Sequence, residues 1–293
     1  MLRPRHDVLP VRRCADACVV TVSACFSPIL ILRIIRIKLL NARFMNGPSS
    51  LQLFCFSYAG ASAAAYLRWR RQLPPWIEVV PVELAGHGRR LSEPLQTTMV
   101  GAIARIEPLI RPEPRRRFAL FGHSLGALVA FECARRFEQR GGPTPCALFA
   151  SGCHAPSQPG TSELSDDPTD DELLAELQRW GGTPPFALAN AELMQLTLPI
   201  LRADLRVAAS YRGQVHSAIS APIHVLAGSL DPLDPAAVRA WRQHTRAEHT
   251  VEWFEGGHFF IHERESDVLA TLTRRLAPWR EPRPGVEATA EDR

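Results

Sequence analysis

The chain has 293 residues, of which 46% are hydrophobic and 22% charged, so it can bury a sizeable core and fits neither a disordered nor a fibrous class. Its formal net charge of +4 is small for this length, and its arginines are scattered among acidic residues, which argues against nucleic-acid binding. Its seven cysteines, an odd number without paired zinc spacing, indicate reduced thiols in a cytoplasmic protein and no metal site.

Residues 1–48 differ in composition from the rest of the chain. Their basic start is followed by an uncharged run over residues 17–32 and by Ile-rich sequence interrupted by arginine and lysine. This run is shorter than the ~20 apolar residues that a spanning helix needs, and Pro28 interrupts it. We therefore expect an extension outside the core fold, with Met45 as the true start, and no stable membrane span. A membrane-associating anchor and an export signal are the alternatives.

Residues 49–280 alternate short apolar runs with longer amphipathic ones, which is the pattern of an α/β fold with a mostly parallel sheet and helices on both faces. Strands are expected at Leu51–Phe56, Ile77–Val82, Phe118–Phe121, Ala147–Ser151, Ile223–Ala227 and Val251–Phe254. Helices are expected near residues 62–73, 97–110, 125–138, 235–244 and 266–277. Residues 281–293, with proline, glycine and acidic residues, are expected to form a disordered tail.

A strand–turn–helix motif, Gly122-His123-Ser124-Leu125-Gly126, is the most informative segment of the chain. Small residues at Gly122 and Gly126 suit a turn so tight that a Cβ atom would clash, and its strain would hold the Ser124 hydroxyl above the sheet. The backbone N–H of Leu125 would point to the oxygen that becomes negative during acyl transfer. We therefore predict Ser124 as a nucleophile and Leu125 as one oxyanion-hole donor. The alternative is an ordinary surface turn that has the same Gly-X-Ser-X-Gly pattern by chance.

Residues 155–215 interrupt the alternation of short apolar runs and longer amphipathic runs. The segment between the strands expected at Ala147–Ser151 and Ile223–Ala227 is far longer than a single crossover helix requires. Thr169 and Glu172 have the spacing of a capping box, and a Gly-Gly-Thr-Pro-Pro segment at 181–185 would end the helix that follows. A second helix is expected from about Ala191. We expect a helical lid, which either only packs on the body or is a mobile cover over an acyl-binding channel.

A serine nucleophile needs a base that takes its proton and an acid that fixes the tautomer of that base. The strand expected at Ile223–Ala227 leads into a turn that carries Asp231, which we predict as the acid. Asp234 is the alternative, but it precedes a proline and fits better as a helix N-cap. After the last expected strand, two glycines let the chain bend so that His258 projects over the sheet edge. We predict His258 as the base.

The second oxyanion donor is expected in the loop after the first strand, Ser57-Tyr58-Ala59-Gly60-Ala61-Ser62, whose small residues allow close backbone approach. Ala59 is the predicted donor, and Tyr58 is the alternative. Among the remaining histidines, His123 is expected to point away from Ser124 and to be structural. His262 is expected to start or flank the final helix.

With these pieces placed, the chain resembles the stand-alone type II thioesterases of polyketide and nonribosomal-peptide assembly lines over roughly 51–278. The resemblance rests on Phe54–Gly60, Val82–Gly88, Phe121–Ala127, Leu148–Gly152, Gly181–Pro185, Leu198–Asp204 and Gly256–Phe260. Two segments depart from the family. Ser57–Ser62 replaces the usual Pro-His-Ala-Gly-Gly-Ser, and Ala85-Gly86-His87 replaces a common Pro-Gly-Arg, which is expected to alter the channel mouth. The family also lacks the N-terminal extension.

The resemblance implies an α/β-hydrolase fold and hydrolysis of acyl thioesters on the phosphopantetheine arm of acyl- or peptidyl-carrier proteins, clearing stalled or wrongly primed units. Ser124 would attack the thioester carbonyl with His258 as base. No metal or organic cofactor is required, because every proton transfer has an assigned side chain. We expect a cytoplasmic monomer. The alternatives are a general carboxylesterase or lipase, a non-catalytic hydrolase-fold binding protein, and a cyclising terminal thioesterase.

Overall fold

The fold is built on a parallel sheet, which a computed structural model describes together with its surroundings for residues 51–113, 116–158, 168–211 and 218–280. The sheet has six strands in the order β2-β1-β3-β4-β5-β6. The strands are β1 (Leu51–Phe56), β2 (Ile77–Val82), β3 (Arg117–His123), β4 (Leu148–Ser151), β5 (Ile223–Gly228) and β6 (His249–Phe254). This arrangement confirms the predicted fold class. The expectations for residues 1–48 and 281–293 lie outside the described residues.

The helices lie close to their expected positions, but some segments expected as single helices are wholly or partly 3₁₀ in form, including the second half of the one expected over residues 235–244. The helical segments are η1 (Ala63–Arg71), η2 (Gly88–Arg90), α2 (Met99–Ile106), η3 (Glu107–Leu109), α3 (Leu125–Gln139), α4 (Asp170–Trp180), α5 (Pro185–Leu188), α6 (Ala191–Ser210), α7 (Pro235–Arg239), η4 (Ala240–His244), α8 (Phe260–Glu263), α9 (Glu265–Leu276) and η5 (Ala277–Trp279). The helix expected over residues 62–73 is the 3₁₀ helix η1. Its three-residue period places Ala63, Tyr66 and Trp69 in one buried row, and both aromatic rings pack on Phe121.

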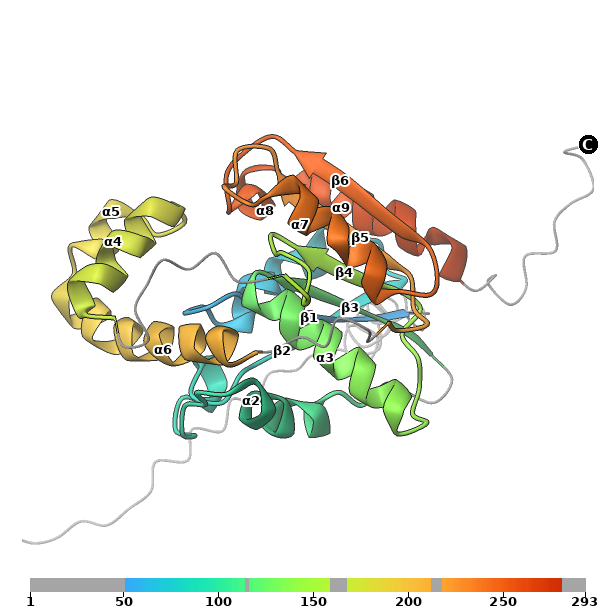
Figure 1. Ribbon diagram of the computed structural model, residues 1–293, viewed down its shortest axis with the longest axis horizontal. Helices are drawn as coiled ribbons and strands as arrows, with labels where there is room; N and C mark the ends of the chain where they lie inside the picture. The colour runs from blue at the N-terminus through green and yellow to red at the C-terminus, as the bar shows by residue number, and fades with distance from the viewer. Residues whose placement is uncertain (1–50, 114–115, 159–167, 212–217, 281–293) are drawn as a thin grey trace, which may run out of the picture. The chain divides into compact units, whose positions relative to one another are not determined.

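Helices cover both faces of the sheet (Figure 1), and buried apolar side chains form a core on each face. All six residues of β1 are buried, as expected for a parallel strand between two helical layers. Phe54 and Phe56 join the core under α2 and α3. Leu53 and Cys55 join the core on the other face, under η1 and α9. Both layers therefore fix the direction of β1 and of the loop that follows it.

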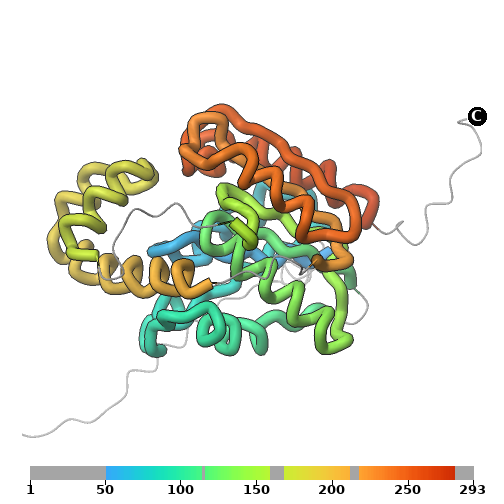
Figure 2. The backbone as a smooth tube through the Cα atoms, viewed as in Figure 1, coloured from blue at the N-terminus to red at the C-terminus, as the bar shows by residue number. Residues whose placement is uncertain are grey.

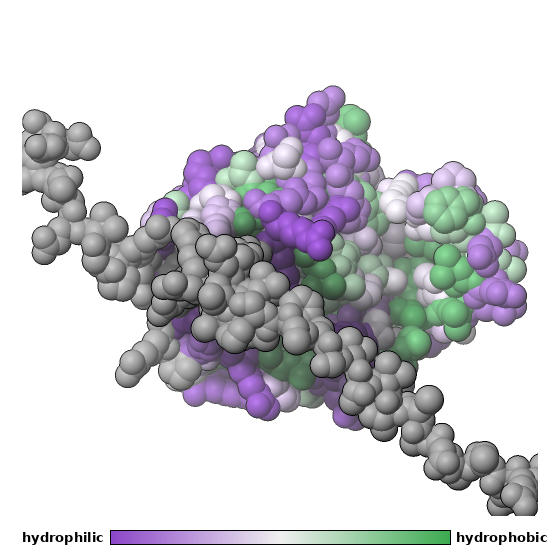
Figure 3. All heavy atoms as spheres, turned by 180° about the vertical axis from the view of Figure 1, so that it is seen from behind, coloured by the Kyte–Doolittle hydropathy of each residue, from purple (hydrophilic) through white to green (hydrophobic). Residues whose placement is uncertain are grey.

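The lid expected between β4 and β5 consists, in its described part, of α4, α5 and α6, which gather at one end of the sheet (Figure 2). The expected capping box is present at the start of α4: the Thr169 hydroxyl accepts from the Glu172 N–H, and the Glu172 carboxylate accepts from the Thr169 N–H. The lid has a small core of its own, formed by Leu173, Met194, Leu198 and Leu201. Hydrophobic side chains also reach its surface (Figure 3), where Phe186 and Leu196 are exposed.

The outer edge of the sheet at β2 offers few groups for further pairing. Pro81 lies in this strand and has no backbone N–H. The carbonyl of Val79, two residues earlier and therefore on the same side of the strand, accepts a hydrogen bond from Arg70 Nε at 3.1 Å. A proline is tolerated here because β2 is an edge strand.

Two expectations from composition can be compared with the described residues. Cys55, Cys133, Cys146 and Cys153 are free thiols, as predicted. Among the helices of the described ranges, none combines the length and apolar character required to traverse a bilayer.

Candidate active site

The predicted site residues follow strands whose carboxyl ends share one edge of the sheet. Ser124 follows β3, and Asp231 and His258 follow β5 and β6. The loop 57–62 follows β1, which pairs directly with β3. In an open parallel sheet this edge is where ligands bind, because the strand ends and helix N-termini converge there.

Ser124 occupies a strained turn between β3 and α3. Its φ of 53° and ψ of −121° are unusual for a residue with a side chain. A Cβ on Gly122 would lie 2.0 Å from the Gly126 carbonyl oxygen, and a Cβ on Gly126 would lie 2.3 Å from the Phe56 carbonyl oxygen. Because both obstacles are backbone atoms, the turn accepts only glycine at these positions. The same close approach brings the first turn of α3 against the loop that follows β1.

Leu125 is the first residue of α3, so its N–H has no acceptor within the helix. The turn is fixed on the other side, where the Ser124 N–H donates to the Ser151 carbonyl at 2.7 Å. The Ser124 carbonyl accepts from the Ala127 N–H at 2.9 Å. The positive end of the α3 dipole therefore lies beside the serine hydroxyl.

His258 and Asp231 form a direct pair, with 2.8 Å between Nδ1 and Oδ2. The Asp231 side chain is 2% exposed and that of His258 is 12% exposed. Since a carboxylate only accepts, Nδ1 carries a proton, which leaves Nε2 as the ring nitrogen that can act as the base. Asp234 instead caps α7, accepting from the Ala236 N–H at 2.9 Å. The structure thus brings Asp231, and not Asp234, to the imidazole.

The two turns that carry this pair are joined through backbone contacts. The Ser229 N–H donates to the Phe254 carbonyl, and the Leu230 N–H donates to the Gly256 carbonyl. A Cβ on Gly228 would lie 2.4 Å from the Gly257 carbonyl oxygen. This close approach sets the separation of Asp231 and His258.

His123 is fully buried beside the site, and its Nδ1 lies 2.9 Å from the Ser151 hydroxyl. Its ring centroid is 4.9 Å from that of His258. Burial, together with the neighbouring rings of His258 and His262, lowers the pKa of His123 well below its usual value. His123 is therefore neutral and places no second positive charge next to His258.

The loop 57–62 is held at both ends by side chains of the body. Tyr58 OH lies 3.0 Å from His262 Nε2, and Arg68 donates to His262 Nδ1 at 2.9 Å. Since arginine only donates, His262 carries its proton on Nε2 and donates it to Tyr58. At the other end, the Glu83 carboxylate accepts from the Ser62 hydroxyl and the Ala63 N–H. Ala59 lies between these anchors, packed against both the main core and the lid core.

The lid reaches the site at the end of α4. The Trp180 ring centroid lies 6.1 Å from that of His258. Gly182, in the Gly-Gly-Thr-Pro-Pro segment, has φ +91°, and a Cβ there would lie 2.3 Å from the Phe259 ring. The segment that ends α4 is therefore in contact with the turn that carries the histidine.

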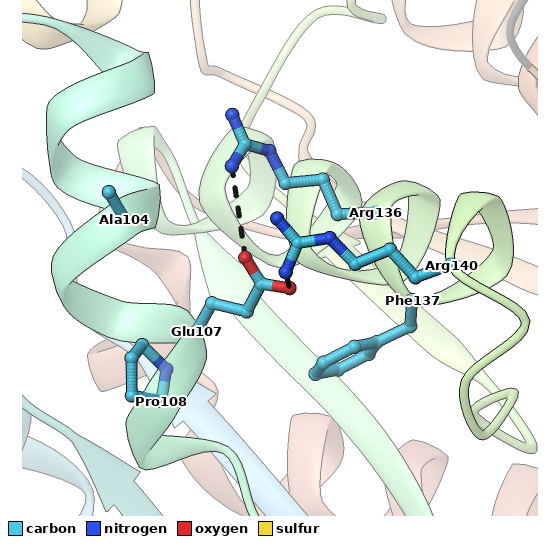
Figure 4. A pocket seen from close by; sticks show the side chains of 6 residues that line it. All are labelled: Ala104, Glu107, Pro108, Arg136, Phe137 and Arg140. Atoms are coloured by element: carbon cyan, nitrogen blue, oxygen red, sulfur yellow. Dashed lines mark hydrogen bonds and ion pairs between the residues drawn. The ribbon is translucent and has the colours of Figure 1, made fainter.

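A pocket of about 420 Å³ lies elsewhere, between α2, η3 and α3 (Figure 4). Glu107 bridges Arg136 and Arg140 in its wall. Arg136 is twelve residues beyond Ser124 along α3, roughly 18 Å along the helix axis. Its paired charges and its distance from Ser124 separate this pocket from the strand–turn–helix motif at residues 122–126, which is called the elbow below.

Several contacts of the site were not predicted from the sequence. The sequence predicts only that His262 starts or flanks the final helix, and in the structure it also holds Tyr58. Asp204 was noted only as part of a motif, and it contacts Gly60 and His87. The role of the Ala85-Gly86-His87 segment at the channel mouth stays a prediction, and the side chain of His87 is 3% exposed and contacts Asp204 of the lid helix α6. The one sequence signal for the Tyr58 contact is the departure from the family at residues 57–62. A different side chain in that loop is expected to have a different contact partner.

Comparison with known proteins identifies relatives over most of the chain. Residues 51–276 match the thioesterase domain family. Thioesterase PikA5 of Streptomyces venezuelae is 35% identical over 80% of this chain and 84% of its own length. The type II thioesterase BorB from the borrelidin biosynthetic cluster is 36% identical, with a TM-score of 0.71 over 78% of this chain and 94% of BorB. ClbQ from the colibactin NRPS/PKS pathway is 32% identical, with a TM-score of 0.74 over 79% of this chain and 98% of ClbQ.

Proposed function

This chain belongs to the thioesterase domain family, and from that premise we propose that it hydrolyses acyl thioesters held on the phosphopantetheine arm of acyl- or peptidyl-carrier proteins. Its role is to clear stalled or wrongly primed acyl units in polyketide or nonribosomal-peptide synthesis. Two solved relatives, ClbQ from the colibactin NRPS/PKS pathway and BorB from the borrelidin biosynthetic cluster, support this assignment.

One observation carries the choice of a thioester over an oxygen ester. The family match extends from residue 51 to residue 276, so it includes the lid as well as the elbow. An elbow serine with an acid and a histidine serves many acyl transfers. The family match does not depend on the serine turn alone, because it also covers the lid, whose Trp180 reaches His258.

In the proposed mechanism, Ser124 Oγ attacks the thioester carbonyl while His258 Nε2 takes the hydroxyl proton. The carbonyl oxygen becomes negative and accepts hydrogen bonds from the N–H groups of Leu125 and Ala59. Asp231 holds the imidazole in the tautomer with the proton on Nδ1 and stabilises the imidazolium. The tetrahedral intermediate collapses, the C–S bond breaks, and the thiol leaves with the proton from His258.

Water then completes the cycle. His258 takes a proton from a water molecule, whose oxygen attacks the acyl-serine carbonyl, and the free acid leaves as Ser124 regains its proton. Because each proton has a donor and an acceptor among these side chains, the steps balance without an added reagent. The protein returns to its starting state.

The test is intact-mass spectrometry of an acetyl-loaded or propionyl-loaded carrier protein incubated with wild type and with Ser124→Ala. We expect loss of the acyl mass with wild type alone. Persistence of the acyl mass with wild type, alongside hydrolysis of a simple aryl ester, would contradict the proposal and indicate an oxygen-ester hydrolase. Equal hydrolysis by Ser124→Ala would contradict the assignment of the nucleophile.

A further inference from the structure

The lid helix α6 places one carboxylate directly on the loop that follows β1. Asp204 Oδ2 accepts the Gly60 N–H at 2.8 Å and faces His87 Nε2 at 2.9 Å. The side chains of Asp204 and His87 are each 3% exposed. A buried carboxylate is costly to desolvate, so both hydrogen bonds are needed to hold it there.

The contacts of His87 favour its doubly protonated form and raise its pKa above the usual value. Its Nδ1 faces the Ala85 carbonyl at 3.1 Å, and its Nε2 faces the Asp204 carboxylate. A carbonyl and a carboxylate only accept, so each ring nitrogen carries a proton. The pair is therefore an imidazolium and a carboxylate, which is stronger than a neutral hydrogen bond. This positive charge compensates Asp204 and leaves the carboxylate available to Gly60.

Gly60 is the residue through which the lid acts on the loop. It has φ +75°, and Leu201 of α6 lies 3.5 Å from the position its Cβ would occupy. The adjacent turn is closed by the Ala61 N–H, which donates to the Tyr58 carbonyl. Asp204 therefore fixes the peptide unit immediately after Ala59. A rotation of that unit would turn the Ala59 backbone as well.

We propose that Asp204 is a positioning residue for acyl transfer, which holds the loop 57–62 so that the Ala59 N–H stays directed at the oxyanion. This inference rests on the proposed function, in which Ala59 is an oxyanion donor. The other anchors of the loop, His262 and Glu83, come from the body. Asp204 comes from the lid, so the docking of α6 completes the set of contacts that holds the loop.

The experiment compares Asp204→Asn and Asp204→Leu with wild type. Asparagine keeps one neutral oxygen for the Gly60 N–H, whereas leucine has similar size and no acceptor. We expect kcat to fall by about tenfold for Asp204→Asn and by about 10² to 10³-fold for Asp204→Leu, the loss typical of one oxyanion donor. KM should stay within about twofold, because the contact acts through the transition state.

A matched control is Glu176→Gln. Glu176 is also a buried lid carboxylate, but it binds Arg179 of its own helix. This variant should keep the wild-type kcat, which separates loss of a lid charge from loss of the Gly60 contact. Thermal unfolding of every variant measures the folded fraction, and rates are expressed per folded molecule. If Asp204→Leu does not fold, the kcat of Asp204→Asn relative to wild type is the test of the inference.

The series is measured on an acyl-loaded carrier protein and on a short aryl ester, which needs the same oxyanion hole but no carrier. A wild type that cleaves only the aryl ester would contradict the carrier assignment, and the Asp204 series on that ester would still test the positioning role. A folded Asp204→Asn with wild-type kcat on both substrates would overturn the inference. A rise in KM with unchanged kcat would overturn it as well.

Discussion

The indole ring of Trp180, at the last residue of lid helix α4, lies with its centroid 6.1 Å from that of the His258 imidazole, at an interplanar angle of 35°. The two residues belong to segments separated by β5 and β6. A lid side chain therefore covers the imidazole that is the proposed base, and shields it from water.

Trp180→Ala should lower kcat/KM by about tenfold, because the His258 imidazole would no longer be covered by an indole ring that excludes water and restricts its motion. Steady-state kinetics on the acyl-carrier substrate measures this. Trp253→Ala is the control, since Trp253 lies on β6 with 39% of its surface exposed. Equal rates for the two variants would show that the covering ring has no part in turnover.

Asp231→Asn should lose about 10⁴-fold in kcat, since an amide can stabilise the wrong imidazole tautomer. The control is Asp234→Asn, because asparagine is as good an N-cap as aspartate and α7 keeps its first turn. The single-turnover rate of each variant gives the comparison. Full activity in Asp231→Asn together with loss in Asp234→Asn would reverse the assignment of the acid.

Gly126→Ala should destabilise the protein by about 3 kcal/mol and abolish activity, because the added Cβ would meet the backbone oxygens of Phe56 and Ser57. Gly141→Ala serves as the comparison. Gly141 has φ +67° and no atom within 4 Å of a Cβ, so only its backbone strain, about 1 kcal/mol, is expected. The free energy of unfolding in urea and the rate of aryl-ester hydrolysis are measured for both variants. Similar losses for both would mean that the close approach at the elbow is not the limiting contact.

The His87–Asp204 pair should make stability depend on pH. Burial lowers the pKa of His87, but the hydrogen bond and charge of Asp204, the Ala85 carbonyl and the charge of Glu83 outweigh it and raise the pKa above 6.5. The protonated ring therefore stabilises the fold fully below pH 6.5, and this stabilisation is lost as the pH rises through the raised pKa. The change is about 1.4 kcal/mol per pH unit between the two pKa values.

His87→Gln provides the measurement, because glutamine can donate to Asp204 but does not titrate. The free energy of unfolding in urea should favour wild type most at low pH, and this advantage should shrink as the pH rises. Asp204 and Glu83 are the charged groups that face His87 and remain in both proteins. An advantage that is independent of pH would show that His87 is neutral in the folded protein.

Local patterns were sufficient to predict the strands, the capping box of α4 and the N-cap role of Asp234, because each depends on residues close in sequence. The direct pairing of Asp231 with His258 also followed from their positions after parallel strands. The contact of Asp204 with His87 joins residues 117 positions apart and depends on how the lid docks. The 3₁₀ form of η1 depends on the fit of Tyr66 and Trp69 against the sheet. Neither leaves a local signal.

The blocked edge at β2 limits how other proteins can recognise this one. Pro81 has no backbone N–H to donate, and the Val79 carbonyl already accepts a hydrogen bond from Arg70. An extended peptide added at this edge could therefore not form a continuous set of backbone hydrogen bonds. Strand addition, a common route both to peptide capture and to fibrillar aggregation, is disfavoured along this side. A partner that approaches β2 must therefore recognise side-chain shape and charge, and its selectivity can be altered by surface substitutions that leave the sheet intact.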